Sequence, residues 1–284
     1  MHQYLPVQNP LVPYVFPEIK KILNSDIELP TYNTRYDVLN GFRNEILHWL
    51  QQGNKTKISG LDRFKYCYVI NGSSQYINDL AKIEKRNIEM HVNEYVAYKK
   101  LLDMYNIPFT EHDDYKTMGM NDENLVIVSY PCSVTGSKNA DAEDLIKNSK
   151  SKITLDSVFL GTNLFPITFD FNELSNVETF LFSFSKAFGM TYHRLGVMFT
   201  DKYIEEYDLY HYHGYANVVA CQYARKIMES YGIDYFTDKY AQIYHEACDL
   251  MACDIGDCIM VGLNPDNNDL ERKVKVTHLF DDLI

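Results

Sequence analysis

The sequence lacks long hydrophobic runs, and no stretch approaches the roughly 18 consecutive apolar residues of a membrane-spanning helix. Its first ten residues, MHQYLPVQNP, lack the basic leader and apolar run of a secretory signal peptide. Basic residues are scarce, because 27 Lys and Arg face 39 Asp and Glu and leave a formal net charge of −12. A protein of that charge repels nucleic-acid phosphates and anionic membranes. We therefore expect a cytoplasmic protein that binds neither nucleic acid nor a membrane.

Metal-ligand spacing is also missing. Six cysteines are scattered through the chain without such spacing: Cys67, Cys132, Cys221, Cys248, Cys253 and Cys258. The pair His211 and His213 has no carboxylate or thiol partner beside it in the sequence, which makes it a weak metal signal. We expect reduced, structural thiols and no metal site.

What the chain does have is an alternation of two periodicities. Between about residues 65 and 200, runs of β-branched and aromatic residues alternate with helical patterns, which is typical of parallel strands joined by crossover helices. We expect strands at 64–70, 87–92, 107–113, 125–131, 153–159, 179–184 and 194–200, then a mostly helical run at 204–253 that breaks near 213–214, and further strands at 258–263 and 274–280. This pattern predicts an α/β domain with a mostly parallel central sheet and flanking helices.

The segment SFSKAFGMTYHRLG, from Ser183 to Gly196, carries the strongest chemical signal. Lys186 ends an apolar strand, hydroxyl side chains precede it by one and three residues, and Arg194 follows it by eight. A lysine amine can form a Schiff base with an aldehyde, while a hydroxyl and a guanidinium can bind a phosphate. The pattern therefore indicates a cofactor with both an aldehyde and a phosphate group.

This segment resembles the motif S-x-[ST/A]-K-x-x-G-x-x-x-x-R-x-G of the class I/II aminotransferases, which are pyridoxal-phosphate enzymes of fold type I. The overall similarity is closest to their histidinol-phosphate aminotransferase branch. The resemblance implies that Lys186 holds pyridoxal 5′-phosphate as a Schiff base. It also implies a large cofactor-binding domain at 36–231 and a small domain built from both chain ends, 1–35 and 232–284. That small domain is reduced compared with the family, mainly after Lys186.

Two further segments resemble the parts of the family that hold the cofactor ring. ITLDSVF places Asp156 where the family has the carboxylate that pairs with the pyridinium nitrogen. A carboxylate at the end of a buried strand needs a cationic partner, and a protonated pyridine is one. NEYVAY places Tyr95 where the family has an aromatic ring stacked on the cofactor, although packing on a helix face is the alternative for this tyrosine.

The turn NGSSQ resembles the phosphate-binding turn of the family. Its Gly72 lets the backbone approach a phosphate, and the hydroxyls of Ser73 and Ser74 lie with helix N-terminal amides that donate to it. The resemblance places Ser183 and Arg194 at the same phosphate.

Two more features imply a homodimer with shared active sites. Tyr36 in RYDVLNGF occupies the position of the tyrosine that reaches the phosphate of the neighbouring subunit, with ordinary packing as the alternative. The loop 211–217 corresponds to one that approaches the partner's active site. His213 in it is a candidate substrate-binding residue, and a plain interface or surface loop is the alternative.

The sequence departs from the family at the phenolic oxygen of the cofactor. Ser133 stands where the family has an asparagine that donates to this oxygen, and Phe159 stands where it has a tyrosine that also donates. Losing both donors disfavours the charged form of the oxygen. We therefore expect the cofactor bound at Lys186 to titrate differently from that of a standard aminotransferase.

The residues expected to bind the substrate depart further from the family pattern. Family members bind the substrate carboxylate with an arginine near the C-terminus, and Arg272 is the only arginine after Arg225. Arg272 is therefore a candidate clamp, with Lys273 or Lys275 as substitutes, or with 270–276 as a solvated charged turn. Asn9 lies in a segment similar to the family's N-P-L-G-P and is another candidate substrate-binding residue.

Three functions follow in order of preference. The first is an aminotransferase-like transferase of amino-acid metabolism that acts on an amino acid or primary amine. The second is a pyridoxal-phosphate decarboxylase, lyase or specialised biosynthetic enzyme with non-standard carboxylate binding. The third is a non-catalytic binding protein of the same fold, against which the retained Lys186 and Asp156 speak.

Overall fold

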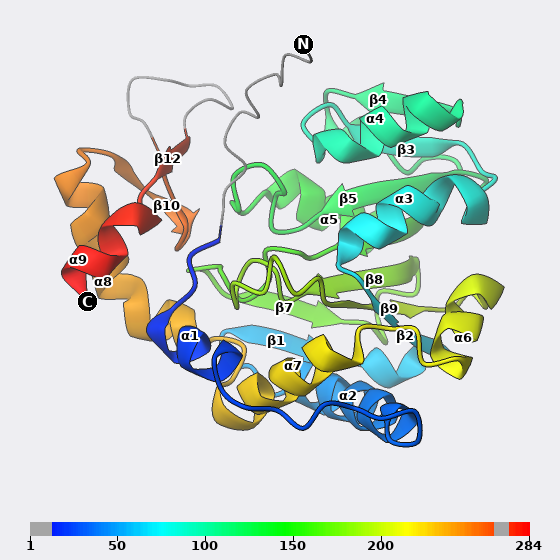
Figure 1. Ribbon diagram of the computed structural model, residues 1–284. Coiled ribbons are helices and arrows are strands. Elements are labelled where there is room, and N and C mark those ends of the chain that lie inside the picture. The colour runs from blue at the N-terminus through cyan, green and yellow to red at the C-terminus, as the bar shows by residue number, and fades with distance from the viewer. Residues whose placement is uncertain (1–12, 264–272) are drawn as a thin grey trace, which may run out of the picture.

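A seven-stranded sheet runs through the middle of the protein (Figure 1). The computed structural model describes residues 13–263 and 273–284. Its strands follow the order β2-β9-β8-β6-β5-β3-β4, and within this sheet β9 alone runs antiparallel to its neighbours. In chain order they are β2 (Tyr66–Ile70), β3 (Ile88–His91), β4 (Phe109–His112), β5 (Leu125–Ser129), β6 (Lys152–Asp156), β8 (Val177–Ser183) and β9 (Gly196–Thr200). The predicted α/β fold with a mostly parallel central sheet is confirmed.

Helices cover both faces of this sheet. Leu125 and Ile127 of β5 belong to one buried cluster, together with residues from α3 (Ser73–Ile83), α4 (Val96–Tyr105) and α6 (Glu205–Tyr212). The alternate residues of β5 belong to the other cluster, with residues from α2 (Arg35–Leu50), α5 (Ala140–Asn148) and α7 (Val218–Ser230). A strand covered on both faces must be apolar throughout, which explains the sequence LVIVS.

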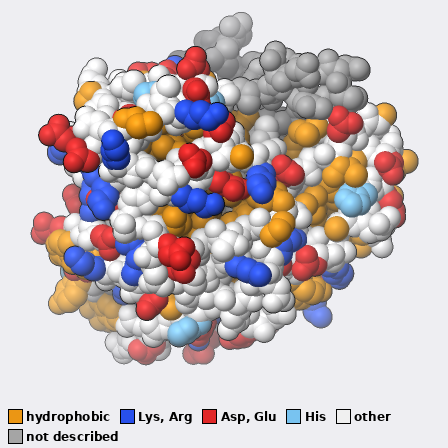
Figure 2. Space-filling view, turned by 180° about the vertical axis from the view of Figure 1, so that it is seen from behind, with side chains coloured by type: hydrophobic (Ala, Val, Ile, Leu, Met, Phe, Trp, Pro, Cys, Tyr) orange, Lys and Arg blue, Asp and Glu red, His pale blue; other side chains and the backbone are white. Residues whose placement is uncertain are grey.

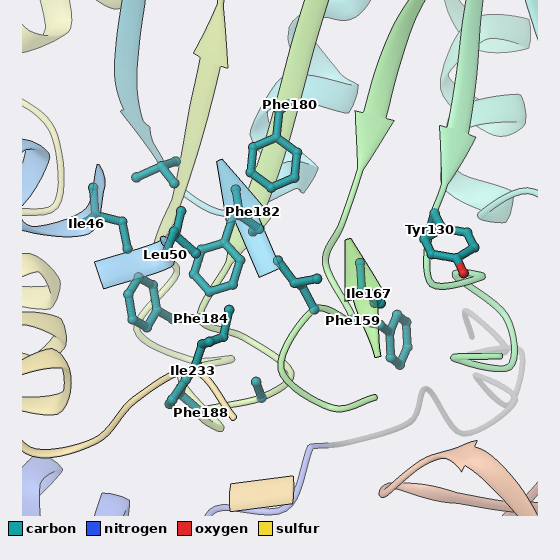
Figure 3. Close-up of a cluster of buried hydrophobic side chains, with 14 of the residues drawn as sticks. Ile46, Leu50, Tyr130, Phe159, Ile167, Phe180, Phe182, Phe184, Phe188 and Ile233 are labelled. Atoms are coloured by element: carbon teal, nitrogen blue, oxygen red, sulfur yellow. The ribbon is translucent and has the colours of Figure 1, made fainter. Parts of the chain in front are cut away.

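Aromatic side chains fill the core around the end of β8. Phe180 and Phe182 lie in the strand, and Phe184 and Phe188 follow it (Figure 3). Trp49 of α2 stacks on Phe184 with ring centroids 5.8 Å apart. Stacked and edge-on rings of this size bury a large apolar area and pack in defined orientations. The loop that carries Lys186 is therefore fixed on a rigid aromatic base.

Two strands were not expected from the sequence. β1 (Thr56–Ser59) and β7 (Ile167–Asp170) form a separate parallel pair, with Thr56 opposite Ile167. Each has four residues that alternate between buried and more exposed positions. Such short strands give a weak periodic signal, and their pairing joins segments that are distant in the sequence.

The C-terminal part forms its own antiparallel sheet beside α8 (Tyr235–Leu250), on the left of Figure 1. Its strands are β10 (Asp254–Cys258), β11 (Val261–Leu263) and β12 (Lys273–Lys275). The prediction of one strand at 258–263 is wrong, because a turn at 259–260 divides this run between β10 and β11. The strand expected at 274–280 ends at 275, and helical turns follow it.

A buried tyrosine holds the β10–β11 hairpin against α8. The hydroxyl of Tyr244 accepts a hydrogen bond from the amide of Gly256 (2.6 Å) and donates to the carbonyl of Val261 (2.9 Å). The hydroxyl thus satisfies a backbone amide on β10 and a backbone carbonyl on β11. The apolar sequence of this segment alone does not reveal the hairpin.

The remaining helices are short. They are α1 (Pro17–Leu23), α9 (Phe280–Leu283) and 3-10 turns at Leu61–Arg63, Tyr115–Thr117 and Thr277–Leu279. Phe16, which precedes α1, stacks on Phe236 and Tyr240 of α8 with centroids 4.7 and 4.5 Å apart. Phe16, near the N-terminal end of the described residues, therefore packs on α8.

Among the described residues, no helix has the length and apolarity needed to cross a membrane. Acidic and basic side chains are interspersed over the face shown in Figure 2. On this face, neither sign of charge is collected in one patch.

The buried His211 makes the fold sensitive to acid. Its Nε2 accepts a hydrogen bond from the amide of Val69 (2.9 Å), and burial lowers the pKa of the imidazole from 6.5 to about 4. The unfolded chain binds this proton first as the pH falls, so stability is lost between pH 6.5 and 4, by about 3 kcal/mol.

We expect His211→Gln to lose less stability than the wild type over this pH range, measured by denaturant unfolding. The exposed His213→Gln is the matched control and should follow the wild type. Parallel pH curves for His211→Gln and the wild type would contradict this assignment.

Candidate cofactor site

The parallel topology brings chemically active residues to one edge of the sheet. The parallel strands β2, β3, β5, β6 and β8 all end at this edge, and the antiparallel β9 begins there. The residues that follow these strand ends, and those that precede β9, therefore meet although they are far apart in the sequence. Ligands of open α/β sheets bind at the carboxyl ends of the strands for the same reason.

Asp156 is the last residue of β6 and is buried, with 4% of its surface exposed. The hydroxyl of Tyr98 donates to its Oδ2 at 2.9 Å. Its Oδ1 is also buried, and no group among the described residues donates a hydrogen bond to it. A buried carboxylate oxygen without a donor is costly, and a cationic N–H group would satisfy it.

The surroundings of Asp156 change its proton affinity. Burial raises the pKa of this carboxyl to about 7, and the nearby charge of Glu94 adds to the rise, while the hydrogen bond from Tyr98 and the backbone amide of Val158 oppose it. Asp156 therefore titrates close to neutral pH. A cation placed beside Oδ1 would return it to the ionised form.

The start of α3 forms a candidate anion site. Gly72 precedes the helix with a φ of 74°, and no side chain caps the helix N-terminus. Arg194 reaches this turn from the loop before β9, donating from Nη2 to the carbonyl of Asn71 (3.0 Å) and to the hydroxyl of Ser74. Helix N-terminal amides and a guanidinium together match a phosphate group.

Close backbone contact explains the glycines of this site. A Cβ at Gly72 would lie 2.7 Å from Nη2 of Arg194, and a Cβ at Gly196 would lie 3.1 Å from the Cα of Gly72. The hydroxyl of Ser183 lies beside them, 3.7 Å from the first of these positions, and Ser73 is buried at the first turn of α3. The structure thus brings together Gly72, Ser73, Ser74, Ser183 and Arg194, five of the residues predicted to bind phosphate.

Lys186 lies in the loop after β8, at the same edge of the sheet. Its Nζ is 5.4 Å from the centroid of the Phe159 ring, which follows β6. Tyr14, Met260 and Phe280 line a small cavity together with Lys186. Segments from both chain ends therefore border the lysine.

The remaining predicted residues lie elsewhere or outside the described residues. Tyr95 immediately precedes α4 and is 46% exposed. Tyr36 lies in α2 and donates from its hydroxyl to the carbonyl of Tyr212, next to the exposed His213. The structure thus brings Tyr36 and the 211–217 loop together. Asn9 and Arg272 lie outside the described residues.

Two residues of the site were missed in the sequence. Tyr98 holds Asp156, and its position three residues after Tyr95 places it on the inner face of α4, which is the available signal. Glu94 accepts a hydrogen bond from the hydroxyl of Ser133 (2.8 Å). No sequence pattern indicated this contact, because it joins the ends of two strands.

Comparison with solved structures identifies the fold. The chain matches an aminotransferase from Staphylococcus aureus with a TM-score of 0.60 at 13% identity, covering 96% of this chain and 90% of that one. It matches the PLP-bound C-S lyase from Staphylococcus hominis with a TM-score of 0.58 at 12% identity, covering 86% and 70%. It matches the histidinol-phosphate aminotransferase from Clostridium acetobutylicum with a TM-score of 0.55 at 18% identity, covering 82% and 73%.

The chain has an aminotransferase fold. No protein-family model matches it, and no curated protein matches its sequence. The aminotransferase fold predicted from the lysine motif is thus confirmed by its three-dimensional similarity. A lyase has the same fold as two aminotransferases, so the reaction must be argued from the site.

Replacing Asp156 should reveal its unfavourable burial in the cofactor-free protein. The folded state holds a proton at Asp156 up to about pH 7, whereas an unfolded aspartate releases it near 3.8, so stability falls as the pH rises between these values. Asp156→Asn has no carboxyl that titrates at this position, so its stability does not fall for this reason. Relative to the wild type, its free energy of unfolding should therefore increase by about 3 kcal/mol between pH 5 and pH 8.

Denaturant unfolding of both proteins without cofactor at the two pH values measures this difference. Each protein is compared with itself at the two pH values, so any effect of the amide on stability that does not depend on pH cancels. A difference that does not change with pH would show that the Asp156 carboxyl titrates normally.

Proposed function

We propose that this protein binds pyridoxal 5′-phosphate and acts as an aminotransferase-like transferase on an amino acid or primary amine. The observation that carries the proposal is the buried Oδ1 of Asp156, which has no donor among the described residues. A pyridinium N–H group fits this position. The candidate phosphate site at Gly72 and Arg194 and the nearby Lys186 supply the other two attachment points that this cofactor needs.

Each attachment has a separate physical basis. Lys186 provides the amine that binds the cofactor aldehyde, and it then serves as the base that moves the proton of the substrate Cα. Asp156 stabilises the protonated ring nitrogen, while Tyr98 holds the carboxylate in place. When bound, pyridoxal phosphate supplies an electron sink for the substrate carbanion.

The phosphate would be held by backbone amides of α3, the hydroxyls of Ser73, Ser74 and Ser183, and the guanidinium of Arg194. Tyr95 would cover one face of the ring after a movement of its exposed side chain. In a homodimer, Tyr36 would reach the phosphate of the partner, and the neighbouring 211–217 loop with His213 would border the partner's substrate. This arrangement gives a shared role to Tyr36 and to the 211–217 loop, which lie together in the structure.

A lyase or decarboxylase that uses the same cofactor is the second candidate. The observation in its favour is the sparse supply of carboxylate-binding groups, since Arg272 is the only arginine after Arg225. The carboxylate clamp fixes which bond of the substrate breaks, and the sequence candidates for the substrate side, Arg272 and Asn9, lie outside the described residues. If another group binds the carboxylate, a different bond is exposed. A non-catalytic binding protein is the third candidate.

The phosphate assignment predicts a selective loss of affinity. Arg194→Gln removes the guanidinium but keeps side-chain length, so affinity for pyridoxal phosphate should fall about tenfold to a hundredfold. Affinity for pyridoxal, which lacks the phosphate, should change little. Equilibrium dialysis measures both constants, and equal losses for the two ligands would contradict a contact between Arg194 and phosphate.

The reaction is tested with an amino-acid and amine panel, incubated with the protein, pyridoxal phosphate and 2-oxoglutarate. Transamination yields glutamate together with the oxo acid or aldehyde of the substrate, and mass spectrometry identifies both. Release of carbon dioxide or of a side-chain fragment without glutamate selects the second candidate. Lys186→Ala is the control and should lose every product, whereas absence of products from the wild type supports a binding protein.

A further inference from the structure

Glu94 presents a buried carboxylate in the candidate cofactor site, where the amino-acid sequence predicted none. It follows β3 and immediately precedes Tyr95, with 8% of its surface exposed. Its Oε2 accepts a hydrogen bond from the amide of Ser129 (2.8 Å). Its Oε1 accepts from the amide of Tyr95 (2.7 Å) and from the hydroxyls of Ser129 (2.5 Å) and Ser133 (2.8 Å). Donors thus surround both carboxylate oxygens.

These contacts determine whether the Ser133 hydroxyl can donate a hydrogen bond to a further partner or only accept one. A serine hydroxyl has one proton, and in Ser133 it points to Glu94. The lone pairs of the Ser133 oxygen are then left for any other partner. Ser133 therefore acts as an acceptor toward the cofactor space, whereas the asparagine that the family has at this position donates.

Phe159, the other residue at a family donor position, has no hydrogen-bond donor in its side chain. Phe159 is buried and lies 5.4 Å from the Nζ of Lys186, measured to the ring centroid. It also borders the loop that contains Ser133, since its Cδ1 is 3.5 Å from the position of a Cβ at Gly136. Phe159 therefore lies near both Lys186 and the loop that carries Ser133.

We propose that Glu94 is a positioning residue that turns Ser133 into a hydrogen-bond acceptor, so that the 3-oxygen of the pyridoxal ring is held as a neutral hydroxyl. The 3-hydroxyl keeps its proton and donates to the Ser133 oxygen, while Ser133 donates to Glu94. The negative charge of Glu94 further disfavours a charged oxygen nearby. This inference rests on the proposed binding of pyridoxal phosphate, which it deepens by assigning roles to Glu94, Ser133 and Phe159.

The test is the absorbance spectrum of the protein after reconstitution with pyridoxal phosphate at a fixed pH. The neutral 3-hydroxyl form absorbs at shorter wavelength than the charged 3-oxide form. We expect the short-wavelength band to dominate in the wild type. Glu94→Gln removes the negative charge and weakens the acceptor that holds the Ser133 hydroxyl, so it should raise the ratio of the long- to the short-wavelength band about tenfold.

Two further variants keep the test decisive if Glu94→Gln does not fold. Phe159→Tyr adds a donor to the 3-oxygen and should also increase the long-wavelength band. Ser133→Ala removes an acceptor and should shift the spectrum in the same direction, whereas loss of a donor would shift it toward shorter wavelength. Glu111→Gln on β4, which loses an ion pair with Lys99 of α4, is the matched control and should leave the spectrum unchanged.

The outcomes separate this inference from the proposed function. Uptake of pyridoxal phosphate by equilibrium dialysis, together with a long-wavelength band in the wild type, would overturn the role of Glu94 alone. A shift of Ser133→Ala toward shorter wavelength would do the same. Failure of the wild type to take up the cofactor would overturn the proposed function and this inference with it.

Discussion

The carboxylate of Asp156 is buried at the end of β6 with a tyrosine on one oxygen and no donor on the other among the described residues. The rest of the site is arranged around this difference in hydrogen bonding between the two oxygens. Burial and the neighbouring Glu94 raise its proton affinity, so the protein without cofactor carries a group that is unfavourable near neutral pH. A cationic ring nitrogen would remove this cost. The proposed cofactor binding would therefore be linked to stability through one oxygen atom.

The sheet topology supplies the other attachment points without long connections. Strands that run in parallel place Gly72, Asp156 and Lys186 at the same edge, and the reversed β9 brings Arg194 to this edge from the opposite direction. The rigid aromatic core behind β8 fixes the lysine loop. Beside the lysine, Tyr14 and Phe280 come from the two chain ends. The large sheet thus forms the cofactor side, and the chain ends border it.

Local signals in the sequence were sufficient for the parts of the site that lie within one segment. Lys186 and Asp156 each end an apolar run, and Gly72 lies between a strand and a helix, so pattern and chemistry coincide. The contact between Glu94 and Ser133 could not be predicted, because it depends on the adjacency of β3 and β5. The β1–β7 pair was missed for the same reason. The β10–β11 hairpin was misread because its buried turn is as apolar as its strands.

The most direct test of a pyridoxal-phosphate site is reduction of the reconstituted protein with borohydride, followed by peptide mapping with mass spectrometry. Reduction fixes the cofactor on the amine that holds it. The structure predicts one added phosphopyridoxyl group per chain on the peptide that contains Lys186, and none in Lys186→Ala. No added mass in the wild type, or mass spread over other lysines, would contradict the account.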